Sequence, residues 1–356
     1  MEEKFNCILE LYEKKYEFKQ CEVSEIENVI RFLKEYWNEN HILVRSPEIM
    51  KWQYYDKIKD KYNFIIAIDK KTTEIHGLLG FIMTSQFDES ISTPMRWGAI
   101  WKVRDDVAKK GLGIALKLYM YKNIPAPYTG GIGLSKYSKA INTKMNEEVG
   151  KLQVYYMINE NIQNYRLIDN VTEEDIATCT SKSKKKFIEC NEIKFLNCGV
   201  YFDKLLSYKS PLYYINRYFK HPIYKYKCIQ VINENDICSA CFFIRICSAN
   251  DSRCIMIVDF IGDEYALVGA TNNFKELLRK YEAEYIMFYE YGLDDKALKQ
   301  SGLKLRGTTD IVLPVYYEPF SKVNIDIDYH YFNLPSVPRQ LYFFKADADQ
   351  DRPNRL

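Results

Sequence analysis

Two lysines and two glycines stand in a short turn, Ala108-Lys-Lys-Gly-Leu-Gly113, between two segments of regular pattern. An apolar run over 97–103 precedes the turn, and apolar residues at helical spacing follow it to about Asn123. The first turn of a helix presents backbone N–H groups without intrahelical partners, and glycines let a phosphate approach them closely. This order of strand, turn and helix predicts a site for an anionic group such as a pyrophosphate.

Two common phosphate-binding motifs do not fit this turn. A dinucleotide-binding turn needs Gly-x-Gly-x-x-Gly after the first strand and an acidic residue about 20 residues further on. A P-loop needs a glycine followed by Lys and then Ser or Thr. The sequence has neither motif in that context. The turn therefore favours a phosphate ligand other than a dinucleotide or a nucleoside triphosphate.

The segments around the turn have a mixed α/β pattern. Ser24 with Glu27 predicts a capping box that opens a helix, and Ser46-Pro47 predicts the start of a second helix. Strands are predicted at 16–22, 64–68, 76–83, 97–103, 132–135 and 152–158, a further helix at 136–148, and a helix stop at Gly150. The order β-α-α-β-β-β-α-β-α-β predicts a mixed sheet flanked by helices, with the glycine-rich turn at its middle.

A similar order of elements repeats in the second half of the chain. The helix start at Ser46-Pro47 is echoed by Ser210-Pro211, and each is followed by a hairpin, over 64–83 and 226–247. Further strands are predicted at 255–261, 285–289 and 310–316, and helices at 274–281 and 294–301, the last stopping at Gly302. The two halves therefore look like one fold written twice.

The length of 356 residues also favours two domains. We expect a first domain over 1–160, a connector over 161–206, a second domain over 207–345 and a polar tail over 346–356 that frays as chain ends commonly do.

Composition excludes several classes of protein. The chain is 47% hydrophobic and 28% charged, which is typical of a soluble globular protein. A net charge of +2 gives no global basic field for nucleic acid, and the short basic cluster over 182–186 is typical of a solvated loop. The N-terminus lacks the apolar core of a signal peptide, and no window resembles a membrane span. We therefore expect a cytoplasmic protein without nucleic-acid partners.

Ten cysteines are scattered through the sequence, and only Cys238 and Cys241 have a spacing typical of metal or redox sites. They lie in a β-like run, where residues three apart point to opposite faces. We therefore expect reduced core cysteines and no metal site.

Gly111 and Gly113, flanked by the apolar residues Val103 and Leu116 within this element order, resemble the signature of the GCN5-related N-acetyltransferases. That signature is Arg or Gln, two residues, Gly, one residue, then Gly or Ala, so Ala108 departs from it. The resemblance implies a mixed α/β fold and acetyl-CoA as co-substrate, with no metal. It implies CoA contacts at Trp101, Lys102, Val103, Ala108, Lys109, Lys110, Gly111, Leu112, Gly113, Ile114 and Ala115.

The resemblance also implies direct attack of an amine on the thioester. Family members commonly use a carboxylate upstream of the Val103 position as base, but this strand has none. The nearest titratable groups in sequence that could face the same cleft are Glu74, His76, Asp88 and Glu89. Of these, His76 and Glu89 are the candidate bases, and their ordinary alternatives are a structural histidine and a solvated surface carboxylate. The usual acid, a tyrosine, is replaced by Asn146, which leaves Tyr137 as the candidate acid.

The corresponding turn of the second half carries Asp263 and Glu264, whose carboxylates would repel a pyrophosphate. We expect the second copy to bind no CoA, and to complete the acceptor pocket or to be a structural partner.

The resemblance therefore implies an acyl-CoA-dependent N-acyltransferase acting on an amine of a small acceptor. The tail over 344–354 is similar to tails of acetyltransferase-like proteins encoded with bacterial surface-polysaccharide pathways, which points to a nucleotide-linked amino sugar. Two alternatives stay open: an aminoacyl- or peptidyl-type transferase of the same fold, and a catalytically degenerate binding or scaffold protein. The acyl chain length and the oligomeric state also stay open.

Overall fold

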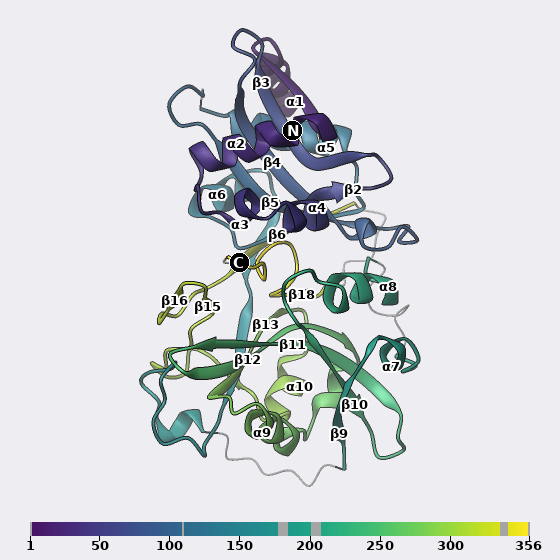
Figure 1. Cartoon of the computed structure of the whole chain (residues 1–356), viewed down its shortest axis with the longest axis vertical. Helices are drawn as coiled ribbons and strands as arrows, with labels where there is room; N and C mark the ends of the chain where they lie inside the picture. Colours follow the sequence, from purple (N-terminus) through teal and green to yellow (C-terminus); the bar gives the residue numbers. More distant parts are fainter. Residues whose placement is uncertain (1, 109, 177–183, 201–207, 335–340, 355–356) are drawn as a thin grey trace. The chain divides into compact units, whose positions relative to one another are not determined.

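The computed structural model describes residues 2–108, 110–176, 184–200, 208–334 and 341–354 (Figure 1). The chain divides into two compact units, one of residues 1–149, 330–337 and 353–356, the other of residues 150–329 and 338–352. Each unit is built on its own β-sheet with helices packed on it, so the predicted mixed α/β fold class is confirmed. Within the described ranges, no helix combines the length and the apolar character that a membrane span requires.

The first unit contains an eight-stranded sheet in the order β1-β3-β4-β5-β6-β17-β7, with β2 paired to β3. Its strands are β1 (Tyr16–Glu22), β2 (Tyr55–Asp56), β3 (Lys61–Asp69), β4 (Ile75–Met83), β5 (Met95–Val103), β6 (Tyr128–Ile132), β7 (Glu148–Lys151) and β17 (Asp328–Asn333). Its helices are α1 (Glu2–Glu13), α2 (Ile26–Tyr36), α3 (Ile42–Arg45), α4 (Pro47–Tyr54), α5 (Leu112–Asn123) and α6 (Lys136–Lys144). Antiparallel pairs run from β1 to β5, and β5 pairs with β6 in parallel.

The second unit contains another eight-stranded sheet in the order β14-β8-β13-β12-β11-β10-β9, with β18 paired to β13. Its strands are β8 (Gln153–Ile158), β9 (Lys186–Cys190), β10 (Lys227–Ile232), β11 (Cys238–Ala249), β12 (Ser252–Gly262), β13 (Tyr285–Tyr291), β14 (Lys304–Leu305) and β18 (Phe343–Phe344). Its helices are α7 (Glu192–Leu196), α8 (Pro211–Tyr214), α9 (Thr271–Lys280) and α10 (Asp295–Gln300), and β15 (Tyr316–Tyr317) with β16 (Phe320–Ser321) forms a separate small ribbon.

The two sheets have the same strand order, and each contains one strand from the other half of the sequence. In the first sheet β17 lies between β6 and β7, and in the second sheet β8 lies between β13 and β14. The strand that we assigned to the end of the first domain therefore belongs to the second sheet. The expected connector over 161–206 contains β9, which is the edge strand of that sheet. Sequence order alone does not reveal these exchanged positions, because strand pairing depends on the whole sheet.

Several predicted helix ends agree with the structure. Ser46 Oγ accepts a hydrogen bond from the Ile49 N–H at 3.2 Å, and Ser210 Oγ accepts one from the Tyr213 N–H at 3.0 Å, so both serines cap a helix whose first residue is proline. Gly302, at φ 92°, follows the end of α10 in the left-handed conformation that glycine favours.

Other predicted helix signals are wrong. The capping box is formed by Glu22 and Glu25 and not by Ser24, which lies inside the 3-10 turn Val23–Glu25. Gly150 lies within β7, while α6 ends at Lys144 and Asn146 takes the left-handed conformation at φ 57°. Asparagine tolerates this conformation better than other non-glycine residues, so it ends the helix in place of a glycine.

Two predicted strands are displaced or shortened. The strand expected at 132–135 lies at 128–132, as β6. The strand expected at 310–316 is reduced to one bridge between Val312 and Asp169 and to the short β15, with Pro314 interrupting the run.

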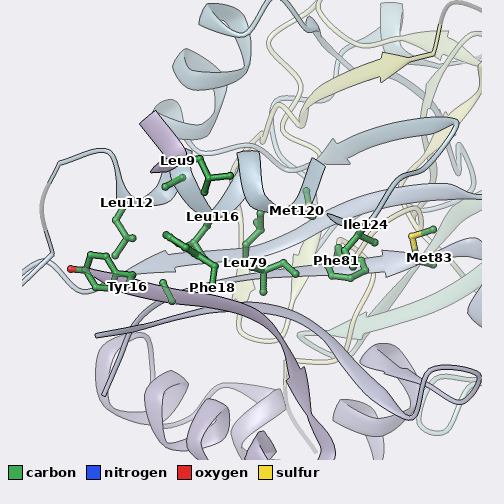
Figure 2. Close-up of a cluster of buried hydrophobic side chains, with 13 residues drawn as sticks. Leu9, Tyr16, Phe18, Leu79, Phe81, Met83, Leu112, Leu116, Met120 and Ile124 are labelled. Atoms are coloured by element: carbon green, nitrogen blue, oxygen red, sulfur yellow. The ribbon is translucent and has the colours of Figure 1, made fainter. Parts of the chain in front are cut away.

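A cluster of buried side chains fixes α5 on the first sheet (Figure 2). Leu112, Leu116 and Met120 recur every four residues along α5 and pack with Leu79 and Phe81 of β4. Burial of side chains of this size contributes roughly 1.5–3 kcal/mol each. The N-terminal turn of α5 is therefore held in a fixed place relative to β4 and β5.

The C-terminal segment is not a frayed tail, which corrects our expectation for 346–356. Asp347 and Asp351 are buried in the second unit. Asp351 lies 2.7 Å from Arg245 and 2.9 Å from Lys345, and Asp347 lies 2.8 Å from Lys209. Charged residues are normally exposed, and these are buried because cations pair with them. Lys209 and Arg245 come from distant segments, and Lys345 comes from the same segment.

Candidate active site

The first unit contains a cavity of about 430 Å³ where the parallel strands β5 and β6 separate. Their pairing ends at Gly98 and Gly131, although β5 continues to Val103. Both glycines line the cavity, together with side chains of α5 and α6. Beyond Gly98, the edge of β5 that faced β6 has no partner in that strand, so its main-chain groups are left for a ligand.

A bulge in β5 lies at the same place. Trp101 pairs with Leu79 and Gly98 pairs with Phe81, so three steps along β5 match two along β4. As a result two consecutive residues, Gly98 and Ala99, both line the cavity. Bulges bend a strand and redirect its backbone, and they occur often beside active sites.

The two glycines of the turn are required for different reasons. Gly111 precedes α5 with φ at 104°, a conformation that a side chain would strain, and a Cβ there would lie 2.8 Å from Tyr12 Oη. The Tyr12 hydroxyl donates to the Lys110 carbonyl, which fixes the turn. A Cβ at Gly113 would lie 3.1 Å from Trp101 Nε1. Gly111 therefore allows the turn, and Gly113 allows α5 to approach β5.

The predicted CoA contacts are placed as follows. Trp101, Lys102, Val103 and Gly113 line the cavity. Leu112 and Ala115 are buried in the core, and Ala108 packs against it, so these three offer a ligand their main chain rather than their side chains. Lys110, Gly111 and Ile114 belong to the turn and the first turn of α5, and Lys109 lies outside the described residues.

Only one of the three predicted catalytic residues lies at the cavity. Tyr137 lines it and is 85% exposed. His76 is buried elsewhere, with Nδ1 3.3 Å from the Tyr16 hydroxyl and 3.7 Å from Asp69, and burial lowers its pKa. Glu89 is an exposed residue of the loop before β5 and does not line the cavity. In this geometry His76 is a buried structural histidine and Glu89 is a solvated surface carboxylate, the alternatives that we gave for each.

Sequence reasoning missed a buried charge network at the cavity. Lys117 Nζ lies 2.6 Å from Glu147 Oε1 and also 2.6 Å from Asn142 Oδ1. His330 Nδ1 lies 2.6 Å from Glu147 Oε2, and the Tyr121 hydroxyl donates to Glu147 Oε1 at 2.8 Å. Lys117 and His330 line the cavity, and Glu147 lies behind them. The network therefore joins α5 to β17, two elements far apart in the sequence.

Burial and mutual charge set the protonation of this network. Burial would raise the pKa of Glu147, but His330 and Lys117 lower it to about 2. Burial lowers the pKa of Lys117 to about 8, against the attraction of Glu147. Burial also lowers the pKa of His330, against the attraction of the nearby Glu147 carboxylate. Near neutral pH the site therefore holds a carboxylate and a neutral imidazole.

The position of Glu147 favours a proton on one nitrogen of His330. Oε2 of the carboxylate lies 2.6 Å from Nδ1 and attracts a proton to it, which leaves Nε2 of the neutral ring with its electron pair. Nε2 lies against β6, since a Cβ at Gly131 would be only 2.6 Å from it. A base is thus held where β5 and β6 separate.

The sequence contains a signal for one member of this network and none for another. Lys117 is the one charged residue over 112–121, an anomaly in an otherwise apolar helix. His330 gives no such signal, because nothing local shows that β17 joins the first sheet.

Comparison with known proteins gives the fold. No protein-family model matches the chain, and no curated protein matches its sequence. Among solved structures it is similar to a GCN5-related N-acetyltransferase from Anabaena variabilis, with 12% identity, a TM-score of 0.54 and coverage of 89% of this chain and 72% of that one. A probable N-acyltransferase from Enterococcus faecalis has 8% identity, a TM-score of 0.51 and coverage of 88% and 71%. A GCN5-related N-acetyltransferase from Kribbella flavida has 9% identity, a TM-score of 0.50 and coverage of 88% and 70%.

These similarities extend over most of the chain. The protein therefore has the fold of the GCN5-related N-acyltransferases, as the sequence resemblance implied.

Proposed function

We propose that the chain is an acyl-CoA-dependent N-acyltransferase whose active site is the cavity of the first unit. The observation that supports this most is the meeting of two features at that cavity. The N-terminus of α5 supplies an anion site, and His330 supplies a neutral base at the end of the β5–β6 pairing. A cavity that served only packing would require neither of them.

CoA is proposed to lie between the separated strands. Its pantetheine arm follows the free edge of β5 over 99–103, and its pyrophosphate lies on the main-chain N–H groups of the turn over 108–115. The anion is bound by the backbone, so the departure at Ala108 does not remove the mechanism. Lys110 adds positive charge beside the turn.

His330 is proposed to take the role that we predicted for His76 or Glu89, since neither of those residues reaches the cavity. Nε2 accepts a proton from the attacking amine, and Glu147 holds the ring and stabilises the imidazolium that forms. Lys117 balances the charge of Glu147, so the carboxylate stays ionised throughout.

The transfer itself forms a C–N bond and breaks the C–S bond of the thioester. A main-chain N–H of β5 beyond Gly98 stabilises the oxyanion of the tetrahedral intermediate. The Tyr137 hydroxyl, at the edge of the cavity, gives a proton to the leaving thiolate. The amine attacks the thioester directly, so no acyl-enzyme forms.

The proposed donor is acetyl-CoA, and the proposed acceptor is a small amine, with nucleotide-linked amino sugars the first class to test. This acceptor class is suggested by the sequence similarity of the tail, which is a buried segment and not the frayed end that we expected. The alternatives are an aminoacyl- or peptidyl-type transferase and a binding protein. The test below separates the proposed acetyltransferase from a binding protein.

The test is CoA release and acceptor mass, measured with acetyl-CoA and a panel of amino sugars. We expect turnover by wild type and a loss of about 100- to 10,000-fold in kcat for His330→Ala. His76→Ala is the matched control, a buried histidine outside the cavity, and should keep the wild-type rate if it remains folded. Equal rates for wild type and folded His330→Ala would overturn the assignment of the base. Acetyl-CoA binding without turnover on any amine would favour a binding protein.

A further inference from the structure

Three cysteine thiols of the second unit form a triangle. Cys238 Sγ lies 3.7 Å from Cys241 Sγ, and Cys198 Sγ lies 3.9 Å from Cys241 Sγ. All three sulfur atoms lie within 4.8 Å of one another. Cys198 follows α7, whereas Cys238 and Cys241 belong to β11, so the triangle joins two separate elements.

A β-bulge explains why Cys238 and Cys241 lie together, contrary to our expectation that they point to opposite faces. Ala240 pairs with Val231 and Cys238 pairs with Ile232, so two steps along β11 match one step along β10. The extra residue, Ser239, reverses the alternation of side chains. Cys238 therefore points to the same face as Cys241.

The triangle has the dimensions of a tetrahedral thiolate site. Zinc binds cysteine sulfur at about 2.3 Å, and ligands at tetrahedral angles are then about 3.8 Å apart. The two sulfur separations at Cys241 fall on this value. A disulfide would need one pair of sulfurs at about 2.05 Å and would leave the third thiol without a role.

The triangle supplies three sulfur ligands. Cys228 of β10 is buried, but it is not among the thiols that all lie within 4.8 Å of one another. Cys198 is only half-buried, which gives an ion a path to the cluster. Three protein ligands leave the fourth tetrahedral position of a zinc ion to a water molecule, which reaches it past the half-buried Cys198.

We propose that Cys198, Cys238 and Cys241 bind a single Zn²⁺ ion. The ion ties the segment that contains α7 to β11, so its role is to hold these two elements together. This site lies in the second unit and does not depend on the acyltransferase proposed for the first.

The proposal is tested on the full-length chain, purified reduced and stripped of metal with a chelator, then titrated with Zn²⁺ against a chromophoric competitor. We expect one Zn²⁺ per chain, and a thiolate-to-cobalt charge-transfer band when Co²⁺ replaces it. Cys198→Ser, the least buried ligand change, should weaken Zn²⁺ binding by more than about 100-fold, since even indirect contacts to a zinc site are worth about 10- to 100-fold.

The matched control is Cys247→Ala, because Cys247 is a buried cysteine of the same strand, β11, outside the cluster. It should bind Zn²⁺ as wild type does. A sample of the wild-type chain is first unfolded and treated with a thiol reagent, to show that its cysteines are reduced. The proposal fails if this reduced protein, when folded, binds no stoichiometric Zn²⁺. It also fails if the control loses the ion as fully as Cys198→Ser, or if mass spectrometry of the unreduced protein shows a disulfide between Cys238 and Cys241.

Discussion

In each unit two neighbouring parallel strands separate, and the space between them is occupied differently in the two units. In the first unit the β5–β6 pairing ends at Gly98 while β5 continues, and a cavity lies there. In the second unit the β12–β13 pairing ends at Ile257 while β12 continues to Gly262. Each of these long strands carries a bulge near the point of separation, since Asp259 and Ile257 of β12 pair with Phe243 and Ile244 of β11.

The second separation is filled by the chain itself. Strand β18 pairs with β13, and the Ala346 N–H donates to the Val258 carbonyl at 3.0 Å. Lys209 then joins Asp259 at 2.9 Å to Asp347 at 2.8 Å, with all three side chains fully buried. A backbone segment thus occupies the edge of β12 that corresponds to the free edge of β5.

The turns that follow these strands differ in the same sense. Gly111 opens α5 in a left-handed conformation and leaves the first N–H groups of the helix for a ligand. In the second unit, the Asp263 carboxylate accepts from the Tyr265 N–H at 2.9 Å, so the turn satisfies its own donor. The gap between strands is therefore common to both units, and the residues beside it determine whether the gap has room for a ligand.

The largest expected change in the free energy of unfolding concerns the filled gap, the space between β12 and β13 that the chain itself occupies. Lys209→Met leaves Asp259 and Asp347 without their shared cation, and an uncompensated buried charge costs about 3–5 kcal/mol of stability. Urea unfolding measures this loss. Lys151→Met is the control, because its ion pair with Asp326 is exposed on both sides and is worth at most about 1 kcal/mol. Similar losses in the two variants would show that the filled gap is not held by its buried charges.

A smaller loss of stability is expected when the pH is lowered, because acid protonates Glu147 beside the open gap between β5 and β6. The folded-state pKa of Glu147 is about 2, below its ordinary 4.5, so its contribution to stability is present above pH 4.5 and is lost as the pH falls toward 2. The contribution is on the order of 3 kcal/mol. Unfolding of wild type and Glu147→Gln, measured from pH 5 to pH 2.5, should show a difference that shrinks as the pH falls.

The control for this experiment is Glu89→Gln, in which the replaced carboxyl is exposed. It should stay within about 0.5 kcal/mol of wild type over the same range, as surface substitutions commonly do. A difference between wild type and Glu147→Gln that is constant with pH would mean that Glu147 is not held ionised by its neighbours.

Local patterns predicted the parts of the fold that depend on local physics. The period of α5, the serine caps before Pro47 and Pro211, and the glycine turn at 111 each follow from a few neighbouring residues. The position of the turn between a strand and a helix was therefore predictable.

Long-range pairing escaped prediction for physical reasons. Strands β8 and β17 pair in sheets that their sequence neighbours do not share, so the contribution of His330 to the first unit had no local signal. Asp347 and Asp351 are charged residues whose burial depends on Lys209 and Arg245, cations that lie far from them in the sequence. One extra residue, Ser239, was enough to reverse the expected directions of two cysteines.

The central claim is that the open gap of the first unit, and not the filled gap of the second, holds CoA. Isothermal titration with acetyl-CoA tests it on wild type, Gly111→Glu and Gly307→Glu. The last variant is matched, because Gly307 also has a positive φ, 110°, and is exposed, with no atom within 4 Å of an added Cβ. We predict one site per chain in wild type and in Gly307→Glu, and a loss of at least about 100-fold in affinity for Gly111→Glu, equivalent to about 2.7 kcal/mol. Two sites per chain, no binding to wild type, or equal binding by the two variants would contradict the account.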